Sequence, residues 1–159
     1  MFREMRRKNQ LLSKNDTATI LETCTCGVLG VTGDYGYPYT VPLSFVFKDN
    51  KIFFHCAKEG HKIDSIKKND KVTFCVIERD EVMQKTFTTH YRSVSVFGRA
   101  RVLSNKSEIQ SALESLVEKY SPDYKEEGQQ EIQRALNNVC LVEIKIEHIT
   151  GKACKDIIN

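Results

Sequence analysis

A nine-residue run in the first third of the chain has the pattern of a β-strand with one buried face: Tyr39-Thr40-Val41-Pro42-Leu43-Ser44-Phe45-Val46-Phe47. Side chains two positions apart in a strand share a face, which groups the tyrosine, one valine, the leucine and both phenylalanines. A short turn at 48–51 leads to an apolar run at 52–56, so we expect the two runs to pair as a hairpin. Pro42 has no N–H to donate, which indicates either a gap in the ladder or a plain edge strand.

The second strand runs directly into a segment rich in basic residues: Phe53-Phe54-His55-Cys56-Ala57-Lys58-Glu59-Gly60-His61-Lys62. Gly60 allows a tight turn or a close backbone approach. Ile63 and Ile66 have the spacing of one helical face, so we expect His61 and Lys62 in the first turn of a helix. Free N–H groups at a helix start, with basic side chains beside them, favour a phosphate. The alternative is an ordinary strand-to-helix turn with solvated charges.

The rest of the chain contains further strands and a few helices. We expect strands at 27–32, 71–77, 93–103 and 140–146. We expect helices from a cap at Ser13 to about residue 24, from a cap near Ser104 or Asn105 to about residue 120, and at about 129–136. Gly98 indicates a possible bulge inside its strand. The alternating strand–helix rhythm of a parallel sheet is absent. We therefore predict a mainly β, α+β fold: a small antiparallel barrel with peripheral helices.

Length and composition bound the class of protein. The 159 residues fit one domain, 1–159, since domains commonly have roughly 100–200 residues. The net charge of +3 is mild and interspersed, which gives no case for a nucleic-acid partner. No apolar run approaches the roughly 18 residues of a membrane span, and the first 14 residues lack a secretory apolar region. We therefore expect a cytoplasmic protein with no membrane partner.

The six cysteines have no spacing that indicates a metal or a disulfide. Cys24 and Cys26 are separated by one residue, and this C-x-C spacing is not the C-x-x-C of a redox pair or zinc knuckle. Three of the others lie in apolar, strand-like runs, where a free cysteine behaves as a small hydrophobe. We expect free thiols and no metal site.

Several blocks in the same order resemble the nitroimidazole-resistance family, which belongs to the flavoproteins similar to pyridoxamine-phosphate oxidase. The blocks are Met5-Arg6-Arg7, Gly36-x-Pro38-Tyr39-x-Val41-Pro42-Leu43, Phe54-His55-x-Ala57-x-Glu59-Gly60-x-Lys62 and Tyr91-x-Ser93-Val94-x-x-x-Gly98. The resemblance implies a split-barrel fold and a flavin mononucleotide (FMN) held at the interface of a homodimer. The last forty residues carry little of it.

The resemblance also implies which residues bind FMN. They are Thr40, Val41, Pro42, Leu43, Ser44, His55, Cys56, His61, Lys62 and Ser93. The run 40–44 would line the isoalloxazine with backbone groups, and His55 and Cys56 would border it from the next strand. His61 and Lys62 would bind the phosphate, and Ser93 would give a polar contact. For the dimer face, the candidates are the apolar residues Phe45, Phe47, Val94 and Val96.

Two departures from the oxidase bear on activity. The oxidase has an Arg-Lys pair at the phosphate, where this chain has His61-Lys62, so phosphate binding would be weaker and pH-dependent. The chain ends without the oxidase's basic closing motif, so vitamin B6 oxidation is not expected.

The implied activity is an FMN-dependent reductase for nitroaromatics such as 5-nitroimidazoles, with an unidentified electron donor. His55 is the candidate catalytic residue, because a histidine titrates near neutral pH and can donate a proton beside a flavin. The alternative for His55 is a satisfied core histidine. The alternative for the protein is a flavin or haem carrier without turnover, or a redox sensor.

Overall fold

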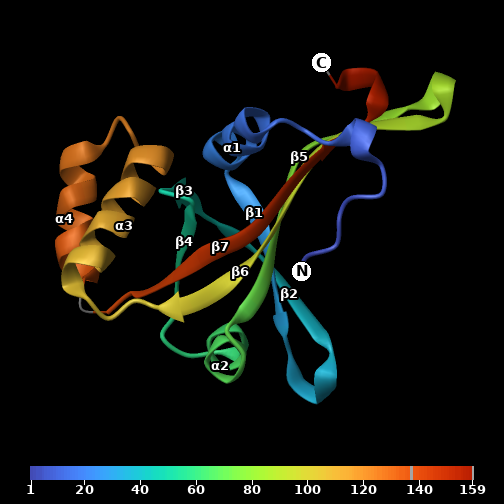
Figure 1. Cartoon of the computed structure of the whole chain (residues 1–159). Coiled ribbons are helices and arrows are strands. Elements are labelled where there is room, and N and C mark those ends of the chain that lie inside the picture. Colours follow the sequence, from blue (N-terminus) through green and yellow to red (C-terminus); the bar gives the residue numbers. More distant parts are fainter. Residues whose placement is uncertain (137, 159) are drawn as a thin grey trace.

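The computed structural model describes residues 1–136 and 138–158, and these form one antiparallel sheet with helices around it (Figure 1). The strands are β1 (Cys26–Thr32), β2 (Pro38–Ser44), β3 (Val46–Lys48), β4 (Lys51–Cys56), β5 (Lys71–Met83), β6 (Thr88–Val102) and β7 (Cys140–Ala153). The α-helices are α1 (Lys14–Thr23), α2 (His61–Lys68), α3 (Lys106–Tyr120) and α4 (Lys125–Ala135). The strand order is β2-β1-β5-β6-β7-β4-β3, and each neighbouring pair is antiparallel.

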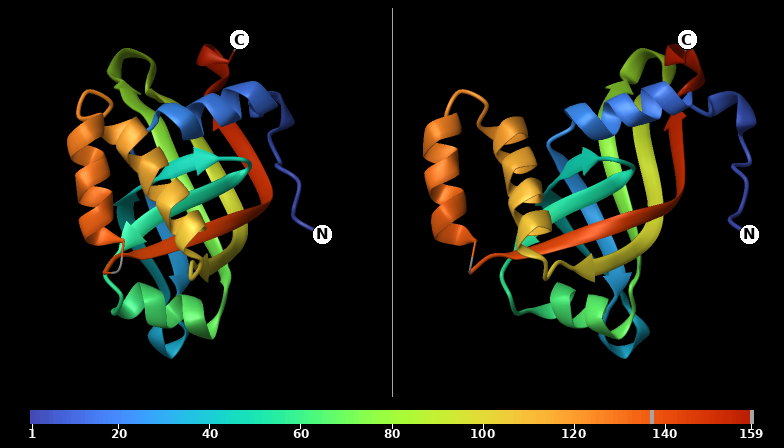
Figure 2. Two further views of the ribbon diagram at one scale, coloured as in Figure 1. Left: turned by 90° about the vertical axis from the view of Figure 1, so that its left-hand side faces the viewer. Right: turned by 60° about the vertical axis from the view of Figure 1, so that its left-hand side comes forward.

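The sheet curls so that its two ends approach each other. Figure 2 shows the teal β3–β4 hairpin crossing over β1, β5 and β6, and β2 contacts β4 across the remaining gap. Helix α1 covers one end of this barrel and α2 covers the opposite end, while α3 packs outside β3 and β4 and α4 packs against α3. The predicted fold class, an antiparallel barrel with peripheral helices, is confirmed.

The run predicted as one strand, 39–47, is two strands that separate at Phe45. β2 pairs with β1 at one end of the sheet, whereas β3 pairs with β4 at the other. Phe45 belongs to neither ladder and is fully buried. Only the β3 part therefore forms the expected hairpin with 51–56. Pro42 lies opposite Val28 in an edge strand, where a missing N–H is tolerated.

The hydroxyl group of Tyr120, at the end of α3, joins the two sides of this break. The Phe45 N–H donates to the Tyr120 oxygen over 2.9 Å. The hydroxyl in turn lies 2.6 Å from the carbonyl oxygen of Thr25 and 2.8 Å from that of Phe45, its two possible acceptors. Burial raises the pKa of Tyr120, so the hydroxyl remains a donor at neutral pH. One side chain thus satisfies backbone groups that have no strand partner.

Strands β5 and β6 are longer than expected. Both continue past the barrel as a two-stranded arm that pairs Arg79 through Met83 with residues 88–92. In β6 the register with β7 shifts between Phe97 and Gly98, so the expected bulge is confirmed. A Cβ atom at Gly98 would lie 2.4 Å from the carbonyl oxygen of Lys145, which only glycine avoids.

The helices begin where their capping residues predict. The Ser13 side chain accepts the Asp16 N–H at the start of α1, and the Asn105 side chain accepts two N–H groups at the start of α3. Helix α3 ends before Pro122, as expected, while α4 begins four residues earlier than predicted. Among the described residues, no helix has both the length and the apolar composition needed to cross a membrane.

The predicted dimer face is wrong, because most of it is core. Phe45 and Val94 are 0% exposed and Val96 is 1% exposed. In β6, Val94 and Val96 point into the barrel, and the neighbouring odd-numbered residues point out. Phe47 is half-buried against the same core. These buried side chains are therefore not available to a second copy.

A buried carboxylate links three strands beside α3. Glu143 of β7 is 4% exposed and accepts hydrogen bonds from Lys51 (2.8 Å) and Arg101 (2.8 and 3.1 Å). Burial opposes its ionisation, but the hydrogen bonds from these two cations outweigh burial and lower the pKa of Glu143. The network ties β4, β6 and β7 together at the end of the barrel that faces α3.

Candidate functional site

The start of α2 has the geometry of an anion site. Gly60 has a φ of +125°, a conformation that favours glycine, and its carbonyl accepts the N–H groups of Ile63 and Asp64 (2.9 and 3.1 Å). The N–H groups of His61 and Lys62 are among those that a helix leaves without an intrahelical acceptor. Since Gly60 has no side chain to cap them, they can meet an external anion, which the helix dipole also favours.

The two basic residues of this turn have different surroundings. The His61 ring stacks on Tyr39 at 4.1 Å between centroids, and its Nε2 lies 3.6 Å from Asp34 Oδ2. Lys68 also contacts Asp34, at 3.5 Å. His61 is therefore held toward the β1–β2 turn beside a carboxylate, whereas Lys62 is half-buried and lies near Cys56. Of the two, Lys62 is the better placed to meet a phosphate.

His55 and Cys56 end β4 on opposite faces. Cys56 packs against the barrel core, directly opposite Cys140 of β7. Burial, together with the Cys140 thiol, raises the pKa of Cys56 to about 11, although Lys62 lowers it in part. His55 is exposed and faces α3 and α4. The interpretation of His55 as a core histidine is therefore wrong.

Residues 40–44 of β2 likewise alternate between two sides. Val41 and Leu43 are half-buried against the barrel core, while Thr40, Pro42 and Ser44 are exposed on the outer face. Their side chains cannot all surround one ring. What they share is the backbone of an edge strand, which has a partner on one side only.

Within one chain, the fold does not place Ser93 close to the other candidate residues. It lies in β6, and β1 and β5 separate β6 from β2. Three strand spacings of about 4.8 Å place Ser93 on the order of 14 Å from β2. Its side chain is on the outer face of the sheet, because Val94 and Val96 on either side of Ser95 point into the barrel.

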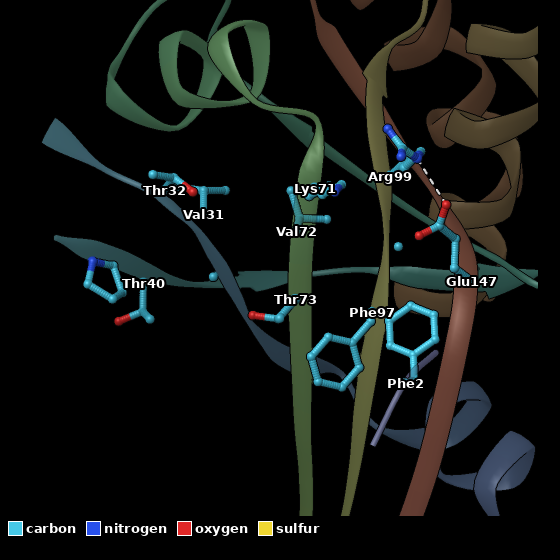
Figure 3. A pocket seen from close by; sticks show the side chains of 13 residues that line it. Phe2, Val31, Thr32, Thr40, Lys71, Val72, Thr73, Phe97, Arg99 and Glu147 are labelled. Atoms are coloured by element: carbon cyan, nitrogen blue, oxygen red, sulfur yellow. Dashed lines mark hydrogen bonds and ion pairs between the residues drawn. The ribbon is translucent and has the colours of Figure 1, made fainter. Parts of the chain in front are cut away.

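Two pockets adjoin the candidate residues. Thr40 lines a pocket of about 480 Å³ on the outer sheet face. Figure 3 shows Thr40 and Thr73 on one side of it, the rings of Phe2 and Phe97 at its end, and the Arg99–Glu147 ion pair at another edge. Gly30 lies in the floor of this pocket, where a Cβ would lie 2.5 Å from Thr73 Oγ1.

Ser44 and His55 line a different pocket, of about 360 Å³, between β4, α3 and α4. Sequence reasoning missed it. The spacing of Leu113, Leu116 and Val117 predicts a helix face packed in the core, and nothing in the pattern shows that part of this face borders a cavity.

Three solved structures resemble the whole fold. A candidate 5-nitroimidazole antibiotic resistance protein from Bacteroides thetaiotaomicron has a TM-score of 0.75 and 21% identity, with 90% of this chain and 86% of that chain covered. A conserved hypothetical protein from Mycobacterium tuberculosis has a TM-score of 0.81 and 18% identity, with 94% and 90% covered. A protein from Mycobacterium smegmatis described as binding FAD and haem has a TM-score of 0.75 and 16% identity, with 92% and 73% covered.

At these identities the likeness shows the fold alone. The sequence matches no protein of curated function closely enough to count as a relative. A family model described as pyridoxamine 5'-phosphate oxidase matches residues 13–153, which include every strand, every α-helix and all the candidate residues above. The chain therefore belongs to the pyridoxamine 5'-phosphate oxidase family and has its split-barrel fold.

Proposed function

We propose that the protein is a flavin-dependent reductase that binds FMN and acts on nitroaromatics such as 5-nitroimidazoles. The observation that carries the proposal is the edge strand β2, which contacts β4 and lies close to the open start of α2. A flavin needs hydrogen-bonding groups for its ring and an anion site for its phosphate, and these two features supply them. Family membership and the likeness to the Bacteroides protein support the substrate class.

The proline of β2 indicates how the ring would be held. Because Pro42 has no N–H, we expect it at a position whose backbone groups point away from β1. The same alternation then directs the N–H and C=O groups of Thr40 and Ser44 toward the open edge. These groups would recognise the polar edge of an isoalloxazine ring, while Val41 and Leu43 would pack beneath it.

The phosphate would lie at the start of α2. The backbone N–H groups of His61 and Lys62 and the Lys62 ammonium group provide charge-assisted hydrogen bonds for a monophosphate. FMN ends in such a group, which is why we favour it over the FAD named for the Mycobacterium smegmatis protein. Asp34 beside His61 opposes the negative charge, so the affinity would be lower than with an Arg-Lys pair.

A homodimer would complete the site. Ser93 can reach a ligand at β2 only from a second copy, packed on the outer face of the sheet. That face exposes apolar side chains: Ile77 is 60% exposed and Phe97 is 38% exposed. Burying them in a two-fold interface would place each Ser93 toward the other chain's β2.

His55 would act as the proton donor. Bound FMN would supply the two-electron chemistry, and the chain's residues would supply position and protons. The exposed imidazole, next to Ser44 and at the mouth of an apolar pocket, can protonate a substrate oxygen as the substrate is reduced.

Stopped-flow spectroscopy tests this function. The purified protein, incubated with FMN, should show flavin absorbance bands that bleach with NADH or NADPH and return when a 5-nitroimidazole is added. A protein that retains no flavin bands after incubation with excess FMN and removal of the unbound cofactor would refute the proposal.

A second candidate function, flavin or haem binding without turnover, is favoured by the position of His55. An exposed imidazole beside an apolar pocket can ligate haem iron. A Soret band after incubation with haem, lost in His55→Ala, would support this second function. Flavin that bleaches but never reoxidises with any nitroaromatic would also support it.

A further inference from the structure

Half of the residues that line the pocket between β4, α3 and α4 are aliphatic. Six of its lining residues are aliphatic: Leu113, Leu116, Val117, Ile132, Ala135 and Val139. Its volume of about 360 Å³ lies within the roughly 300–1,000 Å³ typical of small-molecule sites. Helices α3 and α4 approach closely at Gly128, where a Cβ would lie 2.4 Å from Val117 Cγ1. The pocket is thus framed by packed helices.

The polar groups of the pocket lie where it meets the proposed flavin site. His55 and Ser44 line it, and both also belong to the set proposed to contact the isoalloxazine ring. Tyr120 lines it too, but its hydroxyl is bonded to the backbone at Phe45 and Thr25. The Ser44 side chain also hydrogen-bonds to Tyr120, so His55 is the group of these three that can turn toward a ligand in the pocket.

The charge of the lining excludes one class of ligand. Among the described residues that line the pocket there is a carboxylate, Glu131, and no lysine or arginine. His55 at the mouth is a cation only when it is protonated, and transfer of an anion into the aliphatic part of the pocket, which has no permanent cation, is unfavourable. An uncharged, flat molecule loses little on entering.

We infer that this pocket is the substrate chamber of the reductase and takes an uncharged aromatic nitro compound, with its nitro group at His55 and its ring between α3 and β4. The inference rests on the proposed function and deepens it. The α3–α4 hairpin, rather than the outer-face pocket at Thr40, then determines which substrates are accepted.

Two matched substitutions in α4 test the assignment. Ala135→Phe places a ring inside the pocket, whereas Gln133→Phe places the same ring on the exposed side of the helix. Methyl NMR of the purified protein, with and without FMN, would follow titration with a 5-nitroimidazole. We expect shifts at Leu113, Leu116 and Val117, lost in Ala135→Phe and kept in Gln133→Phe. Shifts at Thr40 and Thr73 instead, or equal binding by both variants, would overturn the assignment.

Kinetics separates this inference from the proposed function. Flavin content and flavin reduction by the nicotinamide donor should be equal in both variants, and so should reoxidation by ferricyanide. Reoxidation by the nitroimidazole should slow at least tenfold in Ala135→Phe alone. If no form binds flavin, the proposed function fails and the NMR result still decides the pocket.

Two further measurements guard the test. If Ala135→Phe does not fold, the isosteric Val117→Thr should weaken nitroimidazole binding several-fold, and unchanged binding would count against the pocket.

The anion 4-nitrobenzoate should bind at least tenfold more weakly than nitrobenzene, and the reverse order would overturn the proposed ligand class. Methyl shifts that depend on protein dilution alone would show that a second copy fills the pocket, which also overturns it.

Discussion

Removal of the Tyr120 hydroxyl tests how the split between β2 and β3 is held. In Tyr120→Phe the N–H of the fully buried Phe45 loses its acceptor at 2.9 Å. The Thr25 carbonyl loses a donor as well, but Thr25 is exposed, so water can replace that bond. The carbonyl of Phe45, the hydroxyl's other possible acceptor, also loses its contact, so the cost is at least that of one buried, unsatisfied donor.

An unsatisfied buried group costs about 1–3 kcal/mol. For a chain of this length, 1 kcal/mol corresponds to about 2–4 °C in Tm, so Tyr120→Phe should melt about 2–12 °C below the wild type. The pocket beside Tyr120 should keep its shape, because the ring is retained.

Calorimetry and urea unfolding would measure the loss, with Tyr124→Phe as the control. Tyr124 follows four residues later and is exposed, so the same chemical change there should leave the stability within about 0.5 kcal/mol. Equal Tm values for the two variants would show that the Tyr120 hydroxyl does not stabilise the backbone between β2 and β3, and would refute the reasoning.

Further predictions concern the proposed cofactor, the assembly, the buried carboxylate and the bulge. Lys62→Ala should raise the Kd for FMN about tenfold to a hundredfold and leave riboflavin binding unchanged; calorimetric titration with equal FMN affinities would contradict the phosphate site. Light scattering at micromolar concentration should give twice the 18.3 kDa chain mass, and a monomer would count against a shared site. Because the pKa of Glu143 is lowered in the folded state, its ionised form stabilises the fold above its unfolded pKa, about 4.3, and this stabilisation is lost as the pH falls below that value. The urea midpoint of the wild type should therefore fall with decreasing pH in this range, and that of Glu143→Gln should fall less. Gly98→Ala should destabilise the chain by at least about 1–3 kcal/mol through contact with the Lys145 carbonyl, and an unchanged urea midpoint would rule that contact out.

Much of the fold could be predicted because its signals are local. Ser13 and Asn105 are short polar side chains that cap helix starts, and Gly60 marks a turn that its φ of +125° bears out. The bulge at Gly98 is visible as a glycine within a strand. Each of these depends on neighbours in sequence, so the pattern alone is sufficient.

The rest depends on contacts between distant segments. The apolar–polar alternation of 39–47 continues through Phe45, so the sequence does not show that the strand breaks there. A residue buried between two strands is as apolar as a residue within one strand. The arm at 79–92 is largely polar and has only scattered apolar residues, such as Val82 and Phe87, so it lacks the alternation of a half-buried strand. That Asp34 lies beside His61 follows from the position of the β1–β2 turn over α2, which sequence spacing does not give.

The break at Phe45 has a consequence for the order in which the chain folds. The β1–β2 and β3–β4 pairs each close a loop of a few residues, while the Lys51–Glu143 contact spans 92 positions. Short loops close early because their closure costs little entropy, whereas pairings between distant segments form later. β2 and β4 take fixed positions in one sheet once β5, β6 and β7 have paired between β1 and β4. A cofactor that touches both hairpins would therefore bind last, and its spectrum would report the final step of folding.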